Sequence, residues 1–138
     1  MAINNYPAQS AIEFIDETLV KQIPAIQRID EVNRSKAHFF ELGNGGKQFA
    51  VIVGDQDKQT GKFDKRQTQI LLECLPGEMV DVEPVAQEKY YNGASTKRSI
   101  SRLAPPQQRS VRVGSETGLR NLLEWYANAP AAAAPVVA

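Results

Sequence analysis

The sequence has very few residues of the types that build disulfide-rich folds, metal sites and many active sites. Among 138 residues there is one cysteine, one histidine and one tryptophan. A single thiol, Cys74, cannot close a disulfide bond within the chain, so the fold must be held by its core. No run reaches the roughly 18 apolar residues of a membrane-spanning helix, and the N-terminal stretch lacks the basic segment and apolar run of a secretory signal. We therefore expect a cytoplasmic protein with no membrane partner.

The scarce reactive side chains lie in patterns typical of a core. His38 precedes Phe39 in a stretch with the character of a strand, and Cys74 falls on the same side of its stretch as Ile70 and Leu72. We expect both side chains to be buried and the thiol to be unreactive. The sequence therefore predicts no catalytic residue, no bound metal and no cofactor, and we expect a protein that is not an enzyme.

One acidic stretch resembles a calcium-binding loop only in part. It carries Asp55, Asp57 and Asp64, but the EF-hand pattern also needs glycine at loop position 6 and an acidic residue at position 12. Counting from Asp55, these positions hold Thr60 and Arg66. The stretch is better interpreted as a polar, exposed connection between strands.

Acidic residues are also missing from one long segment, residues 89–113, which contains six basic residues and no Asp or Glu. Residues 1–88 hold nine Lys and Arg against fourteen Asp and Glu, whereas residues 89–138 hold seven against two. The formal net charge of zero therefore hides a charge of −5 in one part and +5 in the other. Such polarity suits binding to a polyanion, or stacking of copies with the basic part of one on the acidic part of the next.

Two helices are predicted from apolar residues at helical spacing. Ser10 and Glu13 have the spacing of a capping box, and Pro24 should end the first helix. Its apolar face consists of Ile12, Ile15, Leu19 and Ile23. The last helix should begin at Ser115 and Glu116, with its apolar stripe at Leu119, Leu122, Leu123 and Tyr126. The stretch 25–36 is ambiguous: its spacing favours a helix slightly, and an edge strand also fits.

Between the helices the apolar period changes to that of strands. Residues 37–42 and 47–53 flank an Asn-Gly turn, which is a strong hairpin signal, and the second run is apolar on both faces like a central strand. In residues 67–75 the mainly apolar side chains alternate with polar ones, which is the pattern of a further strand. Pro76 and Gly77 then turn the chain, so that Val80 and Val82 continue the apolar face and complete a second predicted hairpin.

The fold class follows from this order of elements. We expect one α+β domain over residues 1–127, with a four- to five-stranded, mainly antiparallel sheet, an N-terminal helix, and a C-terminal helix packed on one face. Residues 89–113 should form a long basic loop or arm, whose end at 109–113 can return as a strand. Residues 128–138, rich in Ala and Pro, are predicted to be a flexible tail.

The basic segment supports two hypotheses of function. The first is a non-enzymatic nucleic-acid-binding protein of low sequence specificity, with single strands as one substrate class. Two groups of residues are candidates. Basic side chains would contact phosphates (Lys89, Lys97, Arg98, Arg102, Arg109 and Arg112), and aromatic side chains would stack on nucleobases (Tyr90 and Tyr91). The sequence contains no RNP-like strand, zinc-finger spacing or helix-turn-helix pair, so recognition would depend on charge and stacking. A solvated loop with an excess of Lys and Arg is the alternative interpretation.

The second hypothesis is a structural subunit of a homomeric assembly, such as a component of a phage or virus particle. The basic segment of one copy would then contact the acidic part of its neighbour. Trp125 lies opposite the apolar stripe of the last helix, where an indole is either covered by another part of the chain or exposed as a contact for a partner. We therefore include Trp125 as a candidate partner contact, and we expect a homo-oligomer.

Overall fold

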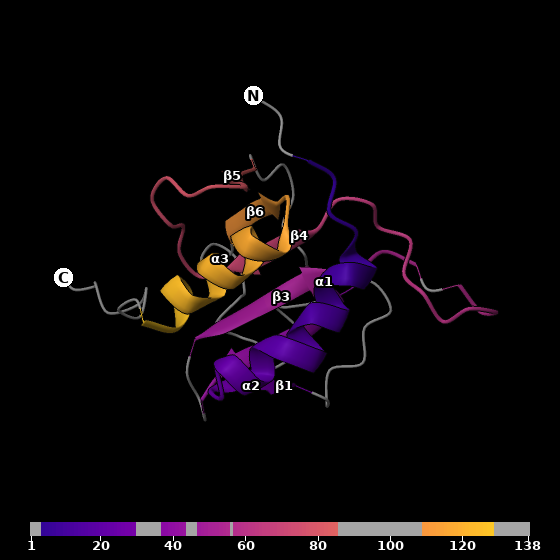
Figure 1. Ribbon diagram of the computed structural model, residues 1–138, viewed down its shortest axis with the longest axis horizontal. Coiled ribbons are helices and arrows are strands. Elements are labelled where there is room, and N and C mark those ends of the chain that lie inside the picture. The colour runs from indigo at the N-terminus through magenta and orange to yellow at the C-terminus, as the bar shows by residue number, and fades with distance from the viewer. Residues whose placement is uncertain (1–3, 30–36, 44–46, 56, 86–108, 129–138) are drawn as a thin grey trace.

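The computed structural model describes residues 4–29, 37–43, 47–55, 57–85 and 109–128. These residues form an α+β fold in which one antiparallel sheet is packed against helices from both ends of the chain (Figure 1). The α+β class, the antiparallel sheet and the two terminal helices are confirmed. The sequence predicted four or five strands, and the structure has six.

The strands are β1 (Ile26–Arg28), β2 (Ala37–Leu42), β3 (Gln48–Ile52), β4 (Gln69–Leu72), β5 (Val82–Pro84) and β6 (Arg109–Val113). Their order across the sheet is β1-β2-β3-β4-β6-β5, and every neighbouring pair is antiparallel. The predicted hairpin of β2 and β3 is confirmed, with Ala37 opposite Ile52. The strand predicted at residues 109–113 is confirmed as β6.

The additional strand is β1, which lies in the stretch where the sequence slightly favoured a helix. Only the edge-strand alternative is correct for Ile26–Arg28, since this segment pairs with β2 through Ile26 opposite Leu42 and Arg28 opposite Phe40. Three residues are too few to show an alternation of period 2, so tertiary pairing decided what the sequence left ambiguous.

The second predicted hairpin is wrong. β4 does not pair with β5, because β6 lies between them and pairs with both. Val80 is 72% exposed, whereas Val82 is buried, so the two valines do not share one apolar face. The turn residues Pro76 and Gly77 therefore belong to a connection that leads around β6 rather than to a tight hairpin.

The N-terminal helical segment consists of α1 (Ala8–Phe14), a π-helical stretch η1 (Ile15–Leu19) and α2 (Val20–Gln22). It ends before Pro24, as predicted. The predicted capping box is wrong, because the N-cap residue is Pro7 and no side chain caps the helix. The backbone N–H of Ala8 instead donates to the carbonyl of Lys65 at 3.0 Å. The helix therefore starts two residues before Ser10, where the chain docks onto the connection preceding β4.

The last helix, α3 (Glu116–Asn128), starts where the sequence predicts. The hydroxyl of Ser115 accepts a 3.0 Å hydrogen bond from the N–H of Gly118 and donates one of 2.7 Å to the carboxylate of Asp81. This contact caps the helix and ties it to the residues before β5. The predicted apolar stripe is confirmed, since Leu119, Leu122, Leu123 and Tyr126 are completely buried.

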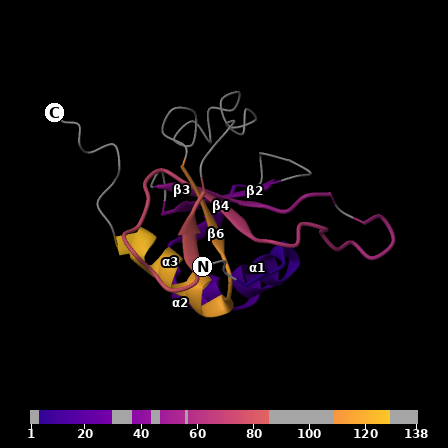
Figure 2. The same ribbon diagram turned by 90° about the horizontal axis from the view of Figure 1, so that it is seen from above.

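The main core lies between the helices and one face of the sheet. In Figure 2, α1, α2 and α3 lie on the same side of the strands. The core contains, among others, Phe14, Ile15 and Leu19 from the N-terminal helices, Phe40, Phe49, Ile70 and Val111 from the strands, and the stripe of α3. A smaller buried cluster faces the other way and consists of Ile29, Ala37, Phe39, Ala50 and Leu71. Within the described ranges, no helix is long and apolar enough to cross a membrane.

Candidate functional site

Most of the predicted nucleic-acid-binding residues fall outside the part of the chain that the structure describes. These are Lys89, Tyr90, Tyr91, Lys97, Arg98 and Arg102. The predicted tail, residues 128–138, lies outside it as well except for Asn128, which is the last residue of α3. The structure places Arg109, Arg112 and Trp125.

The stretch 86–108, which contains most of the basic segment 89–113, is anchored on two neighbouring strands. It leaves the described chain after Val85 and returns at Arg109, and the N–H of Val85 donates a 2.9 Å hydrogen bond to the carbonyl of Ser110. β5 and β6 are paired through Pro84 opposite Val111. Both ends of residues 86–108 therefore meet at one place on the sheet, which we call the β5–β6 root and define as residues 83–85 and 109–112.

Two of the candidate cations belong to this root. Arg109 is exposed at the start of β6, and Arg112 is half exposed three residues later. A guanidinium nitrogen of Arg112 lies 3.6 Å from a carboxylate oxygen of Glu83, and the side chains are 51% and 37% exposed. Arg112 therefore already has an anion within its own chain. An exposed pair of this kind contributes at most about 1 kcal/mol, so a phosphate group can compete with Glu83 for the guanidinium.

Neutral hydrogen-bonding groups flank Arg112 on the sheet. Gln69 is opposite Arg112 on β4, and its side-chain amide donates a 2.6 Å hydrogen bond to the hydroxyl of Ser110. Ser110 and Arg112 alternate with Val111 and Val113, which are completely buried in the main core. Arg112, Ser110 and Gln69 thus share the face of the sheet opposite the helices.

Trp125 is partly buried rather than fully exposed. It packs against the main core, and its ring centroid lies 5.9 Å from that of Tyr126 at an angle of 31°. Part of the Trp125 side chain is still accessible, and its role as a partner contact stays a prediction.

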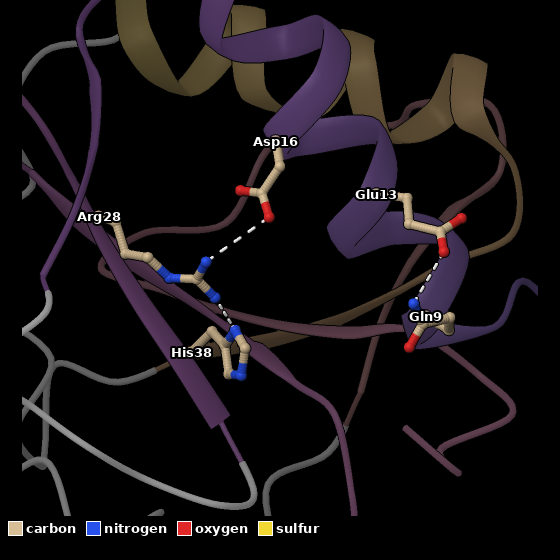
Figure 3. A network of polar contacts seen from close by, with 5 residues as sticks. All are labelled: Gln9, Glu13, Asp16, Arg28 and His38. Atoms are coloured by element: carbon tan, nitrogen blue, oxygen red, sulfur yellow. Dashed lines mark hydrogen bonds and ion pairs between the residues drawn. The ribbon is translucent and has the colours of Figure 1, made fainter. Parts of the chain in front are cut away.

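A polar network that the sequence analysis missed joins three elements on the helix side. Arg28 on β1 contacts Asp16 of η1 at 3.5 Å and donates a hydrogen bond to Nδ1 of His38 on β2 (Figure 3). The guanidinium carbon lies 5.4 Å from the ring centroid of Phe40, and the imidazole meets the ring of Phe63 edge-on at 4.9 Å. His38 is thus half-buried and hydrogen-bonded instead of belonging to an apolar core. The interpretation of residues 25–36 as a helix hid this network, since only strand pairing brings Arg28 beside His38.

A second missed cluster lies where β3 and β4 separate. The hydroxyl of Tyr126 donates to the carbonyl of Gln48 at 2.6 Å and accepts from the N–H of Glu73 at 2.8 Å. A carboxylate oxygen of Glu73 accepts a 2.7 Å hydrogen bond from the N–H of Gln48. The ammonium group of Lys47 lies 5.1 Å from the centroid of the Tyr126 ring, and all four side chains are buried. The cluster joins the end of α3 to the sheet.

In the polar connection between β3 and β4, aspartate carboxylates accept hydrogen bonds from backbone N–H groups of the same connection. Asp57 accepts hydrogen bonds from the N–H groups of Gln59 and Thr60 at 2.7 and 3.0 Å, and Asp64 accepts one from the N–H of Asp55 at 2.8 Å. The hydrogen bonds from Thr60 and Gln59 lower the pKa of Asp57 below its usual value of 3.8. Within the described ranges, no three His, Cys, Asp or Glu residues are grouped so that they could hold a metal ion.

The thiol of Cys74 is partly buried beside the main core, where the sequence predicted full burial. Burial raises its pKa, an effect that Lys47 opposes and Glu73 reinforces. A raised pKa keeps the sulfur in the less reactive thiol form at neutral pH. The expectation that the thiol is unreactive therefore stays a prediction with a physical reason.

The charges of the described residues differ in sign from those of the basic segment. The described ranges contain ten Lys and Arg against thirteen Asp and Glu, a net charge of −3. Residues 86–108 contain four Lys and Arg against one Glu, a net charge of +3. The basic character thus comes from a segment inserted at the β5–β6 root of an acidic folded body.

Comparison of the chain with protein-family models, with curated proteins and with solved structures found no match.

Proposed function

We propose that the protein is a non-enzymatic nucleic-acid-binding protein of low sequence specificity. The observation that carries the proposal is the position of the β5–β6 root, which places Arg109 and Arg112 beside the two ends of residues 86–108. Arg109 and Arg112 therefore lie on the sheet next to a stretch whose sequence contains four further Lys and Arg residues. A polyanion such as nucleic acid is the partner whose charge suits this concentration.

The contacts around Arg112 support the same proposal. Its partner Glu83 is partly exposed, so the ion pair exchanges easily with a phosphate oxygen in water. The partly buried amide of Gln69 lies opposite Arg112 on β4, and its hydrogen bond to the buried Ser110 fixes it there. Tyr90 and Tyr91 of the segment add aromatic rings of the kind that stack on unpaired bases. Contacts to phosphates and stacking on bases depend little on base identity, so binding of this type shows little sequence preference.

A pair of charge variants tests the proposal. Lys97, Arg98 and Arg102 are changed to glutamine in one variant, and Lys58, Lys62 and Arg66 in the other. The second set is exposed on the connection before β4, so both variants lose three cations. Fluorescence anisotropy with labelled single-stranded and duplex DNA of mixed sequence should show affinity lowered at least tenfold by the first variant and at most threefold by the second. Equal losses would contradict the proposal, because net charge alone would then explain binding.

The opposite signs of the folded body and of the segment favour a second candidate, a structural subunit of a homomeric assembly. The +3 segment of one copy would contact the −3 body of the next, and Trp125 would lie at the contact. Such an assembly would form without nucleic acid and would dissociate with salt. Light scattering of protein freed of nucleic acid distinguishes the two: a monomer or small oligomer supports the binding protein, and large salt-sensitive oligomers support the subunit.

A further inference from the structure

We propose that the contact between Arg28 and His38 is a pH-sensitive latch that holds the edge strand β1 on β2. The inference starts from the position of β1 at one edge of the sheet, where its three residues pair only with β2. So short a pairing contains few backbone hydrogen bonds. Side-chain contacts therefore carry a large share of its stability.

Ile26 of β1 is buried in the main core, and Arg28 makes the polar side-chain contacts of the strand. Its guanidinium group lies over the ring of Phe40, pairs with Asp16 and donates to Nδ1 of His38, so it joins β1 to β2 and to η1 (Figure 3). The side chains of Arg28 and Asp16 are 36% and 44% exposed, so their ion pair is weakened by water and salt. The hydrogen bond to His38 is the contact of Arg28 that depends on a proton in the neutral pH range.

The proposal includes a protonation state for His38. An arginine can only donate, so in the proposed latch Nδ1 of His38 accepts the hydrogen bond from Arg28, and the imidazole is neutral with its proton on Nε2. Protonation of Nδ1 replaces the acceptor by a second donor and places an imidazolium beside a guanidinium. The hydrogen bond is then lost and repulsion takes its place. Imidazole is the side chain whose charge changes most readily between neutral pH and mild acid, so we propose that acidification opens this contact.

The other groups around His38 are mostly apolar. Val51 is opposite it on β3, and the ring of Phe63 meets it edge-on. Arg28 from β1 is a charged group in contact with His38, and Asp16 from η1 contacts Arg28 in turn. Asp16 attracts the protonated imidazole only across the guanidinium group. Its negative charge therefore reduces the repulsion without restoring the lost hydrogen bond.

Backbone amide hydrogen exchange at the two ends of the β1–β2 pairing tests the proposal. The N–H of Ile29 donates to the carbonyl of Phe39 at 2.9 Å, and the N–H of Gly43 donates to that of Ala25 at 2.6 Å. The N–H of Gly114, bonded to the carbonyl of Asp81 at 2.8 Å, is an internal reference at the other side of the sheet. Protection factors relative to Gly114 are measured at pH 7.5 and 5.5, after correction for the intrinsic exchange rate.

In the wild-type protein the relative protection of Ile29 and Gly43 should fall about fivefold on acidification, the size expected for loss of one hydrogen bond. His38→Gln keeps a side-chain acceptor and does not titrate, so the relative protection should then be independent of pH. A wild-type protection that does not change, or the same fall in the variant, would overturn the latch. A measurement without mutation is the nitrogen NMR spectrum of the single imidazole at pH 7.5: the proton on Nε2 supports the proposal, and a proton on Nδ1 overturns it.

Discussion

The hydroxyl group of Tyr126 donates a 2.6 Å hydrogen bond to the backbone carbonyl of Gln48. Gln48 lies two residues before Ala50, which is the last residue of β3 paired with β4 at this end, so the hydroxyl enters the sheet where the strands part. The same oxygen accepts from the N–H of Glu73. A side chain of α3 thus replaces the backbone pairing and leaves neither group without a partner in the interior.

Removal of this hydroxyl should be costly. Tyr126→Phe leaves the buried carbonyl of Gln48 and the buried N–H of Glu73 without the bridge, so we expect the free energy of unfolding to fall by about 1–3 kcal/mol. Urea denaturation followed by tryptophan fluorescence measures the change.

Tyr6 supplies a matched control for Tyr126. Its hydroxyl is buried and has no hydrogen-bond partner among the described residues. Burial, followed by the charges of Glu116 and Glu13, raises the pKa of Tyr6, so the group stays neutral. Tyr6→Phe should change stability by less than about 0.5 kcal/mol or increase it, because a polar atom without a partner is removed. Equal losses in the two variants would contradict the assigned role of the Tyr126 bridge.

Alanine substitutions at three glycines can distinguish the cost of a strained backbone from the cost of a steric clash. Gly54 has a φ of +76°, and a Cβ atom there would lie 2.3 Å from a carboxylate oxygen of Asp64. Gly43 has a φ of +81°, and no described atom lies within 4 Å of a Cβ atom built there; Gly77 has neither constraint among the described residues. Thermal unfolding should therefore rank alanine variants with Gly54→Ala least stable, Gly43→Ala lower by about 1 kcal/mol, and Gly77→Ala close to the wild type. A Gly54→Ala variant as stable as Gly77→Ala would contradict this account of the turn.

The carboxylate of Asp57 should make its turn sensitive to acid. Hydrogen bonds from Thr60 and Gln59 lower the pKa of Asp57 in the folded protein, so its contribution to stability is complete above the usual value of 3.8. This contribution is lost as the pH falls from there through the lower folded value. Asp57→Asn keeps an acceptor but does not titrate. The difference in unfolding free energy between the wild type and Asp57→Asn should be constant from pH 6 to pH 5 and should change in favour of the variant below pH 4; a difference that is the same at pH 3 would contradict the assignment.

Local patterns explain which parts of the fold were predictable. The hairpin of β2 and β3 and the apolar stripe of α3 depend on residues close in sequence, so alternation, turn residues and helical spacing were sufficient. The position of β6 depends on pairing with residues about forty positions away, such as Val111 with Ile70. No local pattern encodes that choice, and the second hairpin was therefore predicted wrongly.

In the candidate site too, the features set by local sequence were predictable and those set by distant strand pairing were not. The strand at Arg109–Val113 was expected from its own sequence, but the partner of Arg112 is Glu83, which strand pairing brings beside it. In the sequence Arg112 is a cation in an acid-free segment, and in the structure it is paired with a carboxylate from another strand. The network of Arg28 and His38 was hidden for the same reason, because it exists only when β1 is a strand.

The salt dependence of DNA binding tests the central claim most directly, namely that the cations of residues 89–112 neutralise phosphates. The dissociation constant for a single-stranded oligonucleotide should be measured between about 50 and 300 mM NaCl. Each neutralised phosphate of a single strand contributes about −0.7 to the slope of log affinity against log salt, so six contacts predict a slope of about −4. A slope near zero, or no measurable binding at the lowest salt concentration, would contradict the account.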